Sequence, residues 1–405
     1  MEERIYSLKW YNSILDIGLN KEEWNNIYCN ESIFKQYDFM FGIENSILKD
    51  VTIKYLVILS NNRIIGILPC FNYKLELDVV ANKFVKKSSS FIRKFFPNFF
   101  KLNIFCIGSP VATCVNHIAF IKDFELLKDD KSLGNLVFDE LKVKYQETKS
   151  SLLMVKEIPL NELQLFKDFF KDTFHIFESL PNSFIPIFNE DLLYPNILVK
   201  KYRNRIKRSY NIVEKLPYKW KIITDFSTLV DEVYVLYLNV YNNSSTKFEK
   251  LTKDFFKQMN LLGDKSYLLT CYDDNKLICA ELIIEDDDAI IPMYLGLDYT
   301  FTRNKEIYNN VIFRTIKIAE QKNKKWIIFG QTSYLAKAYS GALFEKLYFA
   351  FYSNNLFVNF LLKYIFKYLF PSFNKPDVSS IQSNVVNSDI FKERLEKSGI
   401  TFENL

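Results

Sequence analysis

The chain has 405 residues, of which 48% are hydrophobic and 25% are charged, and its formal net charge is +5. This length suits two domains better than one core, and the share of apolar residues excludes a disordered chain. So small a net charge does not by itself indicate a nucleic-acid-binding protein. There are two histidines and six cysteines without Cys-x-x-Cys spacing, so no metal site is expected.

The cysteines and the first residues predict a compartment. Cys271 and Cys279 stand inside apolar, strand-like runs, and unpaired core thiols are typical of a reducing environment. The opening stretch MEERIYSLKW lacks the apolar core of a secretory signal. A cytoplasmic protein is therefore predicted.

The first half of the chain has a mixed α/β pattern. Residues 21–48 have a helical composition, and two strand-like runs, Lys54–Leu59 and Arg63–Phe71, then flank the turn Ser60-Asn61-Asn62. This arrangement is a hairpin signal. Three further elements follow in order: the strand Leu102–Ile107, the helix Leu133–Tyr145 and the strand Leu152–Val155.

Two segments combine aromatic and basic residues. Residues 88–103 place Phe among Arg and Lys, and residues 356–370, if helical, are apolar except for a narrow stripe of Asn and Lys. Such a helix is about 22 Å long, short of the ~30 Å hydrocarbon core that a spanning helix must cross. The two segments predict peripheral contact with the inner face of a membrane. Burial in the protein core is the alternative.

A basic segment separates the two halves. Prolines at 181, 186 and 195 precede it, and six of the nine residues from Lys200 to Arg208 are Lys or Arg. One interpretation is a surface that binds the phosphates of a coenzyme, a tRNA or an anionic lipid. The other is a solvated helix face on a connector.

The second half repeats the order of the first. A helical stretch, Leu229–Asn260, leads to two strands that meet at Asp273-Asp274-Asn275, and a third strand follows Asp286–Asp288. Apolar residues at helical spacing run from Ile307 to Ala319, and the buried-type strand Trp326–Phe329 comes next. The matched order indicates a degenerate tandem repeat of one α/β unit.

Polar residues gather after this last strand. They are Gln331, Thr332, Ser333 and Tyr334, with Lys337 one turn later. Side chains and amides that follow a strand end can converge on a ligand. Alternatively, Thr332 and Ser333 cap the next helix.

The paired hairpins, the basic segment KKYRNRIKRS and the closing pattern YLGLDYTFTR…FGQTSYLAKAYSGA resemble tandem-GNAT N-acyltransferases. The likeness is to the branch related to Fem-type aminoacyltransferases and CelD-like acyltransferases, and it covers residues 20–352. It implies an α/β fold of two tandem GNAT-like modules, each a mixed sheet flanked by helices. The implied parts are an N-terminal module 1–187, a basic connector 188–215, an active C-terminal module 216–353, and an amphipathic helix with a tail, 354–405.

The resemblance implies an N-acyltransferase that takes an acyl group from a thioester donor. Acyl-CoA is the expected co-substrate, no cofactor is expected to stay bound, and an amino-lipid or cell-envelope intermediate is the expected amine acceptor. Two alternatives stay open: a Fem-like ligase that uses aminoacyl-tRNA, and a GNAT-like binding module without activity. The tRNA is less favoured, because the sequence lacks the long helical arm of the peptidoglycan branch.

The coenzyme-binding segment departs from the GNAT pattern. Ordinary GNAT domains hold the pyrophosphate of CoA on a glycine-rich turn at a helix N-terminus, whereas Thr302-Arg303-Asn304-Lys305 contains no glycine. The charges of Arg303 and Lys305 can replace the missing amide contacts. Both residues are therefore candidates for cofactor binding, together with the polar residues 331–334.

Acyl transfer to an amine needs a base and a group that stabilises developing negative charge. Glu281 is the predicted base, since a carboxylate inside an apolar strand calls for an explanation; a solvent-facing position is its alternative. Tyr294 is predicted to donate a hydrogen bond or a proton to the leaving thiolate, with a core tyrosine as the alternative. Lys337 is predicted to neutralise a phosphate or the oxyanion. His117 is expected to be structural.

Overall fold

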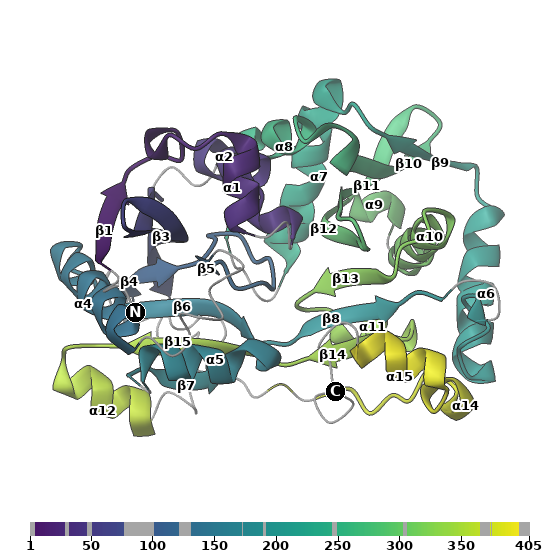
Figure 1. Cartoon of the computed structure of the whole chain (residues 1–405). Coiled ribbons are helices and arrows are strands. Elements are labelled where there is room, and N and C mark those ends of the chain that lie inside the picture. The colour runs from purple at the N-terminus through teal and green to yellow at the C-terminus, as the bar shows by residue number, and fades with distance from the viewer. Residues whose placement is uncertain are drawn as a thin grey trace. The chain divides into compact units, whose positions relative to one another are not determined.

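The computed structural model contains two compact units, each built on one mixed β-sheet (Figure 1). It describes residues 5–28, 32–46, 51–76, 101–120, 131–171, 173–188, 192–244, 249–302, 306–364, 373 and 375–396. The first unit comprises Met1–Ser179, Thr246–Leu251 and Leu347–Phe373. The second comprises Leu180–Ser245, Thr252–Lys346 and Asn374–Leu405.

The first sheet has the strand order β1-β2-β3-β4-β6-β15-β7, with β5 paired to β3. Its strands are β1 Tyr6–Tyr11, β2 Ile53–Ser60, β3 Arg63–Glu76, β4 Lys101–Ile107, β5 Ala119–Phe120, β6 Leu152–Pro159, β7 His175–Glu178 and β15 Leu347–Tyr352. The predicted hairpin is β2–β3, and its turn residues Asn61 and Asn62 have φ of 47° and 65°. Asparagine tolerates this left-handed conformation, which gives a two-residue turn the twist of the flanking strands.

The first unit also contains helices. They are α1 Lys21–Ile27, α2 Tyr37–Ser46, α4 Lys131–Glu147, α5 Leu160–Phe170 and α12 Leu356–Tyr364, with the 3-10 turns η1 Leu15–Ile17 and η2 Ile33–Lys35. On α4, Leu133, Val137 and Leu141 are fully buried at four-residue spacing in the core that α5 also enters. The helices predicted at 21–48 and 133–145 are confirmed, the first as the pair α1 and α2.

The second sheet has the order β14-β8-β13-β12-β11-β10-β9. Its strands are β8 Asn182–Pro186, β9 Tyr218–Ile223, β10 Ser266–Asp273, β11 Lys276–Glu285, β12 Ala289–Leu297, β13 Trp326–Gly330 and β14 Leu343–Glu345. Its helices are α6 Lys200–Glu214, α7 Val230–Asn243, α8 Lys253–Asn260, α9 Tyr299–Thr302, α10 Ile307–Gln321, α11 Tyr334–Tyr339, α14 Ser383–Val386 and α15 Asp389–Glu396, with the 3-10 turns η5 Ser227–Leu229 and η6 Gly263–Lys265.

The two sheets share one order of elements. In the first unit β1, β2, β3 and β4 are followed by α4 and β6, and in the second β9, β10, β11 and β12 are followed by α10 and β13. The last strand of each series is parallel to the one before it, and the others form antiparallel pairs. The predicted α/β fold of two tandem modules, each a mixed sheet flanked by helices, is thereby confirmed.

The units are not two consecutive stretches of chain, although the sequence analysis predicted consecutive modules. The early strand β8 lies in the second sheet beside β13, and the late strand β15 lies in the first sheet beside β6. Each covers the free edge of a parallel strand, whose backbone groups would otherwise lack partners. Residues 347–353, predicted to belong to the C-terminal module, therefore belong to the first unit.

The helix α12 occupies the start of the predicted amphipathic segment 356–370. Its Leu356, Phe360 and Tyr364 are 86%, 51% and 51% exposed, and their four-residue spacing places them on one side of the helix. Residues 88–100 and 365–370, which complete the two predicted membrane-contact segments, lie outside the described residues. Among the helices that the structure describes, none is long and apolar enough to cross a membrane.

Candidate functional site

The strands β12 and β13 part soon after they begin. They pair at Ala289 with Trp326 and at Ile290 with Ile327, and β12 then continues to Leu297 without further pairing to β13. In the first unit the corresponding strands β4 and β6 pair at four positions and stay together to the end of β4. The edge of β12 beyond Ile290 therefore offers peptide groups that β13 does not bind.

The predicted base Glu281 is buried beside this region. Its side chain is 6% exposed, and its Oε2 accepts a hydrogen bond of 2.6 Å from the Thr315 hydroxyl of α10. Burial raises the pKa of Glu281 to about 7, while the Thr315 hydrogen bond and the Lys337 charge act in the opposite direction. The solvent-facing alternative is wrong, and Glu281 is a carboxyl that can change its charge near neutral pH.

Lys337 is also buried, but its ammonium group binds backbone. The residue is 5% exposed, and its Nζ donates to the carbonyl oxygens of Phe329, Gly330 and Gln331 at 2.8, 3.3 and 3.0 Å. These three bonds match the three donors of a lysine ammonium. Lys337 thus fixes the end of β13 and places a positive charge near Glu281; its catalytic role stays a prediction.

Tyr294 lies on the opposite face of the sheet from Glu281. It pairs with Leu282, the neighbour of Glu281 on β11, and adjacent strand residues point to opposite faces. The Tyr294 ring meets Tyr237 of α7 and Phe255 of α8, with centroids 5.9 and 5.6 Å apart. The structure therefore brings Glu281 and Lys337 together and leaves Tyr294 in the aromatic layer under α7 and α8.

The polar residues after β13 form a tight turn. Gly330, Thr332 and Ser333 have φ of 65°, 66° and 51°. Ser333 occupies the N-cap position of α11 but its side chain forms no capping hydrogen bond, so the capping interpretation is wrong for this residue. Strained positions of this kind are often found at functional sites.

Two side chains of this turn bind the segment that leads into β8. Gln331 donates from Nε2 to the Leu180 carbonyl at 2.8 Å, and the Tyr334 hydroxyl donates to the Pro181 carbonyl at 2.9 Å. The Ser183 hydroxyl also donates to the Gly330 carbonyl. These contacts position the turn, and the predicted ligand-binding role of residues 331–334 stays a prediction. Arg303 and Lys305, the other predicted binding residues, lie outside the described residues.

Tyr308 was missed by the sequence analysis. It lies half-buried in the first turn of α10, and burial raises the pKa of its hydroxyl, as does the nearby charge of Glu281, while a side-chain hydrogen bond with Ser333 lowers it. The available signal was spacing: Tyr308 and Thr315 are seven residues apart, so they share one side of a helix. The polar cluster around Glu281 thus combines β11, α10 and α11.

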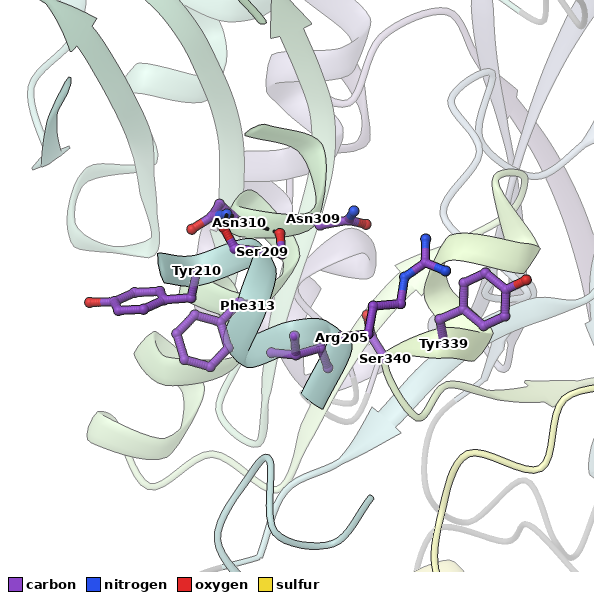
Figure 2. Close-up of a pocket in the computed structure, with 9 residues that line it drawn as sticks. Arg205, Ser209, Tyr210, Asn309, Asn310, Phe313, Tyr339 and Ser340 are labelled. Atoms are coloured by element: carbon purple, nitrogen blue, oxygen red, sulfur yellow. Dashed lines mark hydrogen bonds between the residues drawn. The ribbon is translucent and has the colours of Figure 1, made fainter. Parts of the chain in front are cut away.

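A narrow pocket between α6, α10 and α11 is too small for a substrate. Figure 2 shows the Arg205 guanidinium beside the Tyr339 ring, whose centroid is 4.3 Å away. Asn310 donates to the Ser209 carbonyl at 3.0 Å deeper in the pocket. The free volume is about 10 Å³, which is room for about one water molecule.

The basic segment forms the exposed side of α6. Tyr202, Ile206, Ser209 and Val213 are buried, whereas Lys200, Lys201, Arg205, Lys207 and Arg208 are exposed. The acid of this helix, Glu214, pairs with Arg314 of α10. Among the described residues, no acidic side chain pairs with the five exposed cations.

The first unit contains a buried histidine and a buried acid with structural partners. His117 is 1% exposed, its Nδ1 lies 3.1 Å from the Val115 carbonyl, and burial lowers its pKa to about 3, helped by the charges of Lys35 and Lys156. Glu157 accepts hydrogen bonds from the amide and hydroxyl of Thr113 and from the Cys114 amide. In the described part of the chain, no group of three His, Cys, Asp or Glu is arranged to hold a metal.

The chain is similar to known proteins in structure and not in sequence. No family model matches the chain, and no curated protein matches its sequence. A crystal structure of FemX matches with a TM-score of 0.54 at 8% identity, covering 85% of this chain and 98% of FemX. A tandem GNAT protein from the clavulanic acid biosynthesis pathway gives a TM-score of 0.47 at 8% identity over 87% of this chain and 99% of its own. L-PGS from Bacillus licheniformis gives 0.44 at 11% identity, over 65% and 84%. The chain therefore has the fold of FemX, and the predicted Fem-type resemblance is confirmed at the level of fold.

Proposed function

We propose that this chain is an N-acyltransferase that moves an acyl group from a thioester donor, acyl-CoA, to an amine. The observation that carries the proposal is Glu281, a buried carboxyl with a pKa of about 7, in the unit whose β12 and β13 part. A general base works best when its pKa lies near the working pH. The FemX-like fold agrees with this class of reaction.

The donor is assigned to the edge of β12. The peptide groups beyond Ile290 lack a partner in β13, and an extended ligand with amide groups can bind such an edge as an added strand does. The arm of CoA that carries the thioester contains amides of this kind. A thioester held there lies in the unit that contains Glu281.

The chemical step needs one proton acceptor. The amine nitrogen attacks the thioester carbonyl, the new C–N bond forms, and the C–S bond breaks to release a thiolate. Glu281 takes the proton that the nitrogen loses, and this proton then returns to the thiolate. A carboxylate that is ionised above pH 7 and held out of bulk water suits the first transfer.

The acceptor is an amine at a membrane surface, such as an amino-lipid or a cell-envelope intermediate. The exposed apolar side chains of α12 support this assignment, because an apolar helix side can enter the interface of a bilayer. The chain would then act from the cytoplasmic face. Co-sedimentation with anionic liposomes tests this: Phe360→Asp should reduce binding, and Leu261→Asp, at a 73% exposed leucine of the other unit, should not.

The transfer is tested with purified full-length chain, short- to long-chain acyl-CoA, and amines both in solution and in liposomes. We expect amine-dependent release of CoA thiol, an N-acyl product by mass spectrometry, and loss of both in Glu281→Gln. Absence of thiol release with every donor would reject acyl transfer from acyl-CoA and leave the aminoacyl-tRNA ligase and the binding module.

A second candidate donor is aminoacyl-tRNA, which the charge of α6 favours. Its exposed cations lack acidic partners among the described residues, and Lys and Arg of this kind bind phosphate backbones. Filter binding to charged tRNA decides between the donors. Binding that falls in Lys207→Glu/Arg208→Glu, together with amine acylation from the tRNA, would favour this candidate over acyl-CoA.

A further inference from the structure

The environment of Glu281 differs from that of a carboxylate in an ion pair. Its Oε2 accepts the hydrogen bond from Thr315, a fully buried residue. Lys337 acts on Glu281 through its charge, while its ammonium hydrogens are directed at three backbone carbonyls. The carboxyl is therefore stabilised by one hydroxyl and by one positive charge that other groups hold in place.

The Thr315 hydroxyl has an alternative partner that it does not use. Threonine in a helix commonly donates to the carbonyl four residues earlier, whereas Thr315 donates at 2.6 Å to Glu281. A hydroxyl that donates to a carboxylate stabilises the charged form more than the protonated form. Thr315 therefore favours ionisation of Glu281 from the α10 side.

The Lys337 ammonium group is held by backbone carbonyls. The carbonyls of residues 329–331 hold its Nζ at the end of β13, in a turn with three left-handed residues. In a buried environment a charge acts over a longer distance than in water. Lys337 therefore favours ionisation of Glu281 from the α11 side.

Within the described parts of the chain, the other titratable groups near Glu281 are neutral around pH 7. They are Tyr308 of α10, Tyr267 of β10 and Cys279 of β11, and burial is the main cause that raises the pKa of each. The Glu281 charge contributes in the same direction for all three. None of them supplies a charge that competes with Thr315 and Lys337 at neutral pH.

We propose that Thr315 and Lys337 are positioning residues that favour the charged form of Glu281 inside the sheet, and so set the lower pH limit of acyl transfer. The proposal rests on the proposed function, in which Glu281 is the base. Thr315 is the more specific part, since its hydroxyl touches the carboxylate itself.

The main experiment compares pH–rate profiles of the full chain and of Thr315→Val, which has nearly the same shape without the hydroxyl. The rising limb of the profile should move upward by about one pH unit, because a hydrogen bond to a charged group is worth about that much in pKa. The rate at high pH should recover, because Glu281 is then fully ionised. Thr315→Ser, which keeps a hydroxyl, should restore the original limb.

A matched control is Thr270→Val. Thr270 is also fully buried in this sheet, but it faces away from Glu281, since it pairs with Ala280 and donates to the Lys221 carbonyl at 2.9 Å. In this variant the rising limb of the pH–rate profile should lie at the same pH as in the original chain. An unmoved limb in Thr315→Val, or an equal shift in Thr270→Val, would overturn the role of Thr315.

Lys337 is tested with two substitutions that separate charge from hydrogen bonding. Lys337→Gln keeps donors for the carbonyls and removes the charge, so the limb should move to higher pH. Lys337→Arg keeps the charge, so the limb should stay within a few tenths of a pH unit of the original. If the rising limb lies at the same pH in both variants, the Lys337 charge does not act on Glu281, and Lys337 is not a positioning residue.

A readout without substrate separates this proposal from the proposed function. The pKa of Glu281 is raised from 4.5 to about 7 in the fold, so the folded state holds this proton more tightly, and its contribution to stability is lost as pH rises through 7. The free energy of unfolding, measured against pH, should show this loss in the original chain. The loss should continue to higher pH in Thr315→Val and should be absent in Glu281→Gln. An extended loss without any thiol release would retain the positioning role and reject the proposed transfer from acyl-CoA. A curve in Thr315→Val identical to that of the original chain would reject the positioning role.

Discussion

The two units share an order of elements and differ in what their parallel strands do. In the first unit β4 and β6 pair at four positions, and the loop after β4 is held by three hydrogen bonds to the buried Glu157. In the second unit β12 and β13 pair at two positions. In the first unit the two parallel strands stay paired to the end of β4. In the second unit the peptide groups of β12 beyond Ile290 are not paired with β13.

The buried acids show the same difference. Glu157 receives three donors from the loop it anchors, and it has a φ of 56°. Among the residues that the structure describes, Glu281 accepts a hydrogen bond from Thr315 alone. A carboxylate surrounded by donors is a structural anchor, whereas one with fewer donors and a pKa of about 7 can accept a proton. Repetition of a fold thus does not imply repetition of a site.

The largest expected effect comes from removing each acid. Glu281→Gln should lower the rate of thiol release by about 10²–10⁴-fold, the usual contribution of a general base, with the chain still folded. Glu157→Gln should keep the catalytic rate and lower the stability by about 1–3 kcal/mol, because a buried hydrogen-bond network is weakened. Steady-state rates of thiol release measure the effect on catalysis, and urea unfolding measures the effect on stability. The reverse result would place the site in the first unit.

Sequence reasoning predicted the repeat because its signals are local. The turn Asn61-Asn62 fits a two-residue hairpin, and the apolar positions of α4 and α10 recur with the helical period. The apolar strand around Glu281 indicated a buried carboxylate but left a solvent-facing position open. The exchange of β8 and β15 between the sheets was not predictable, because it depends on pairing between residues far apart in the chain.

The position of Tyr294 could not be read from alternation. β11 and β12 change register between Leu282 and Ile283, which pair with Tyr294 and Pro292, so Met293 is an extra residue. Such a bulge shifts which residues of a strand share a face. The contribution of Tyr308 was hidden for another reason, since its partner Ser333 lies on a different element.

Two lysines that bind backbone carbonyls at the ends of β4 and β13 provide a second test of the comparison. Lys337 is buried and binds three carbonyls, whereas the half-buried Lys156 binds one, that of Ser109, at 2.9 Å. Lys337→Met should cost about 2–4 kcal/mol in urea unfolding, because buried carbonyls lose their donors, and Lys156→Met about 1 kcal/mol. Equal losses of stability in the two variants would mean that Lys337 contributes no more to the second unit than Lys156 contributes to the first.

Two glycines mark where a helix or strand comes closest to its neighbour in each unit. A Cβ at Gly296 of β12 would lie 2.6 Å from Leu236 Cβ, and one at Gly134 of α4 would lie 1.9 Å from the Phe169 carbonyl oxygen. Both Gly→Ala variants should lose about 1–3 kcal/mol of stability. Because Gly296 lies in the part of β12 that has left β13, Gly296→Ala should also raise the KM for acyl-CoA. A raised KM in Gly134→Ala instead would place the donor in the first unit.

The smallest expected effect concerns which face of the second sheet carries the proposed reaction. Tyr294 packs among Tyr237 and Phe255 on the side opposite Glu281, so Tyr294→Phe should keep the ring contacts and lower the rate by less than about tenfold, well below the loss expected for a proton donor. Phe255→Tyr is a matched control that leaves Tyr294 in place and changes the same aromatic layer. A fall of about 10²-fold or more in Tyr294→Phe alone, with unchanged unfolding, would show that Tyr294 reaches the reacting groups. The working face would then be the α7 and α8 side, and the contrast between Glu157 and Glu281 would no longer locate the site.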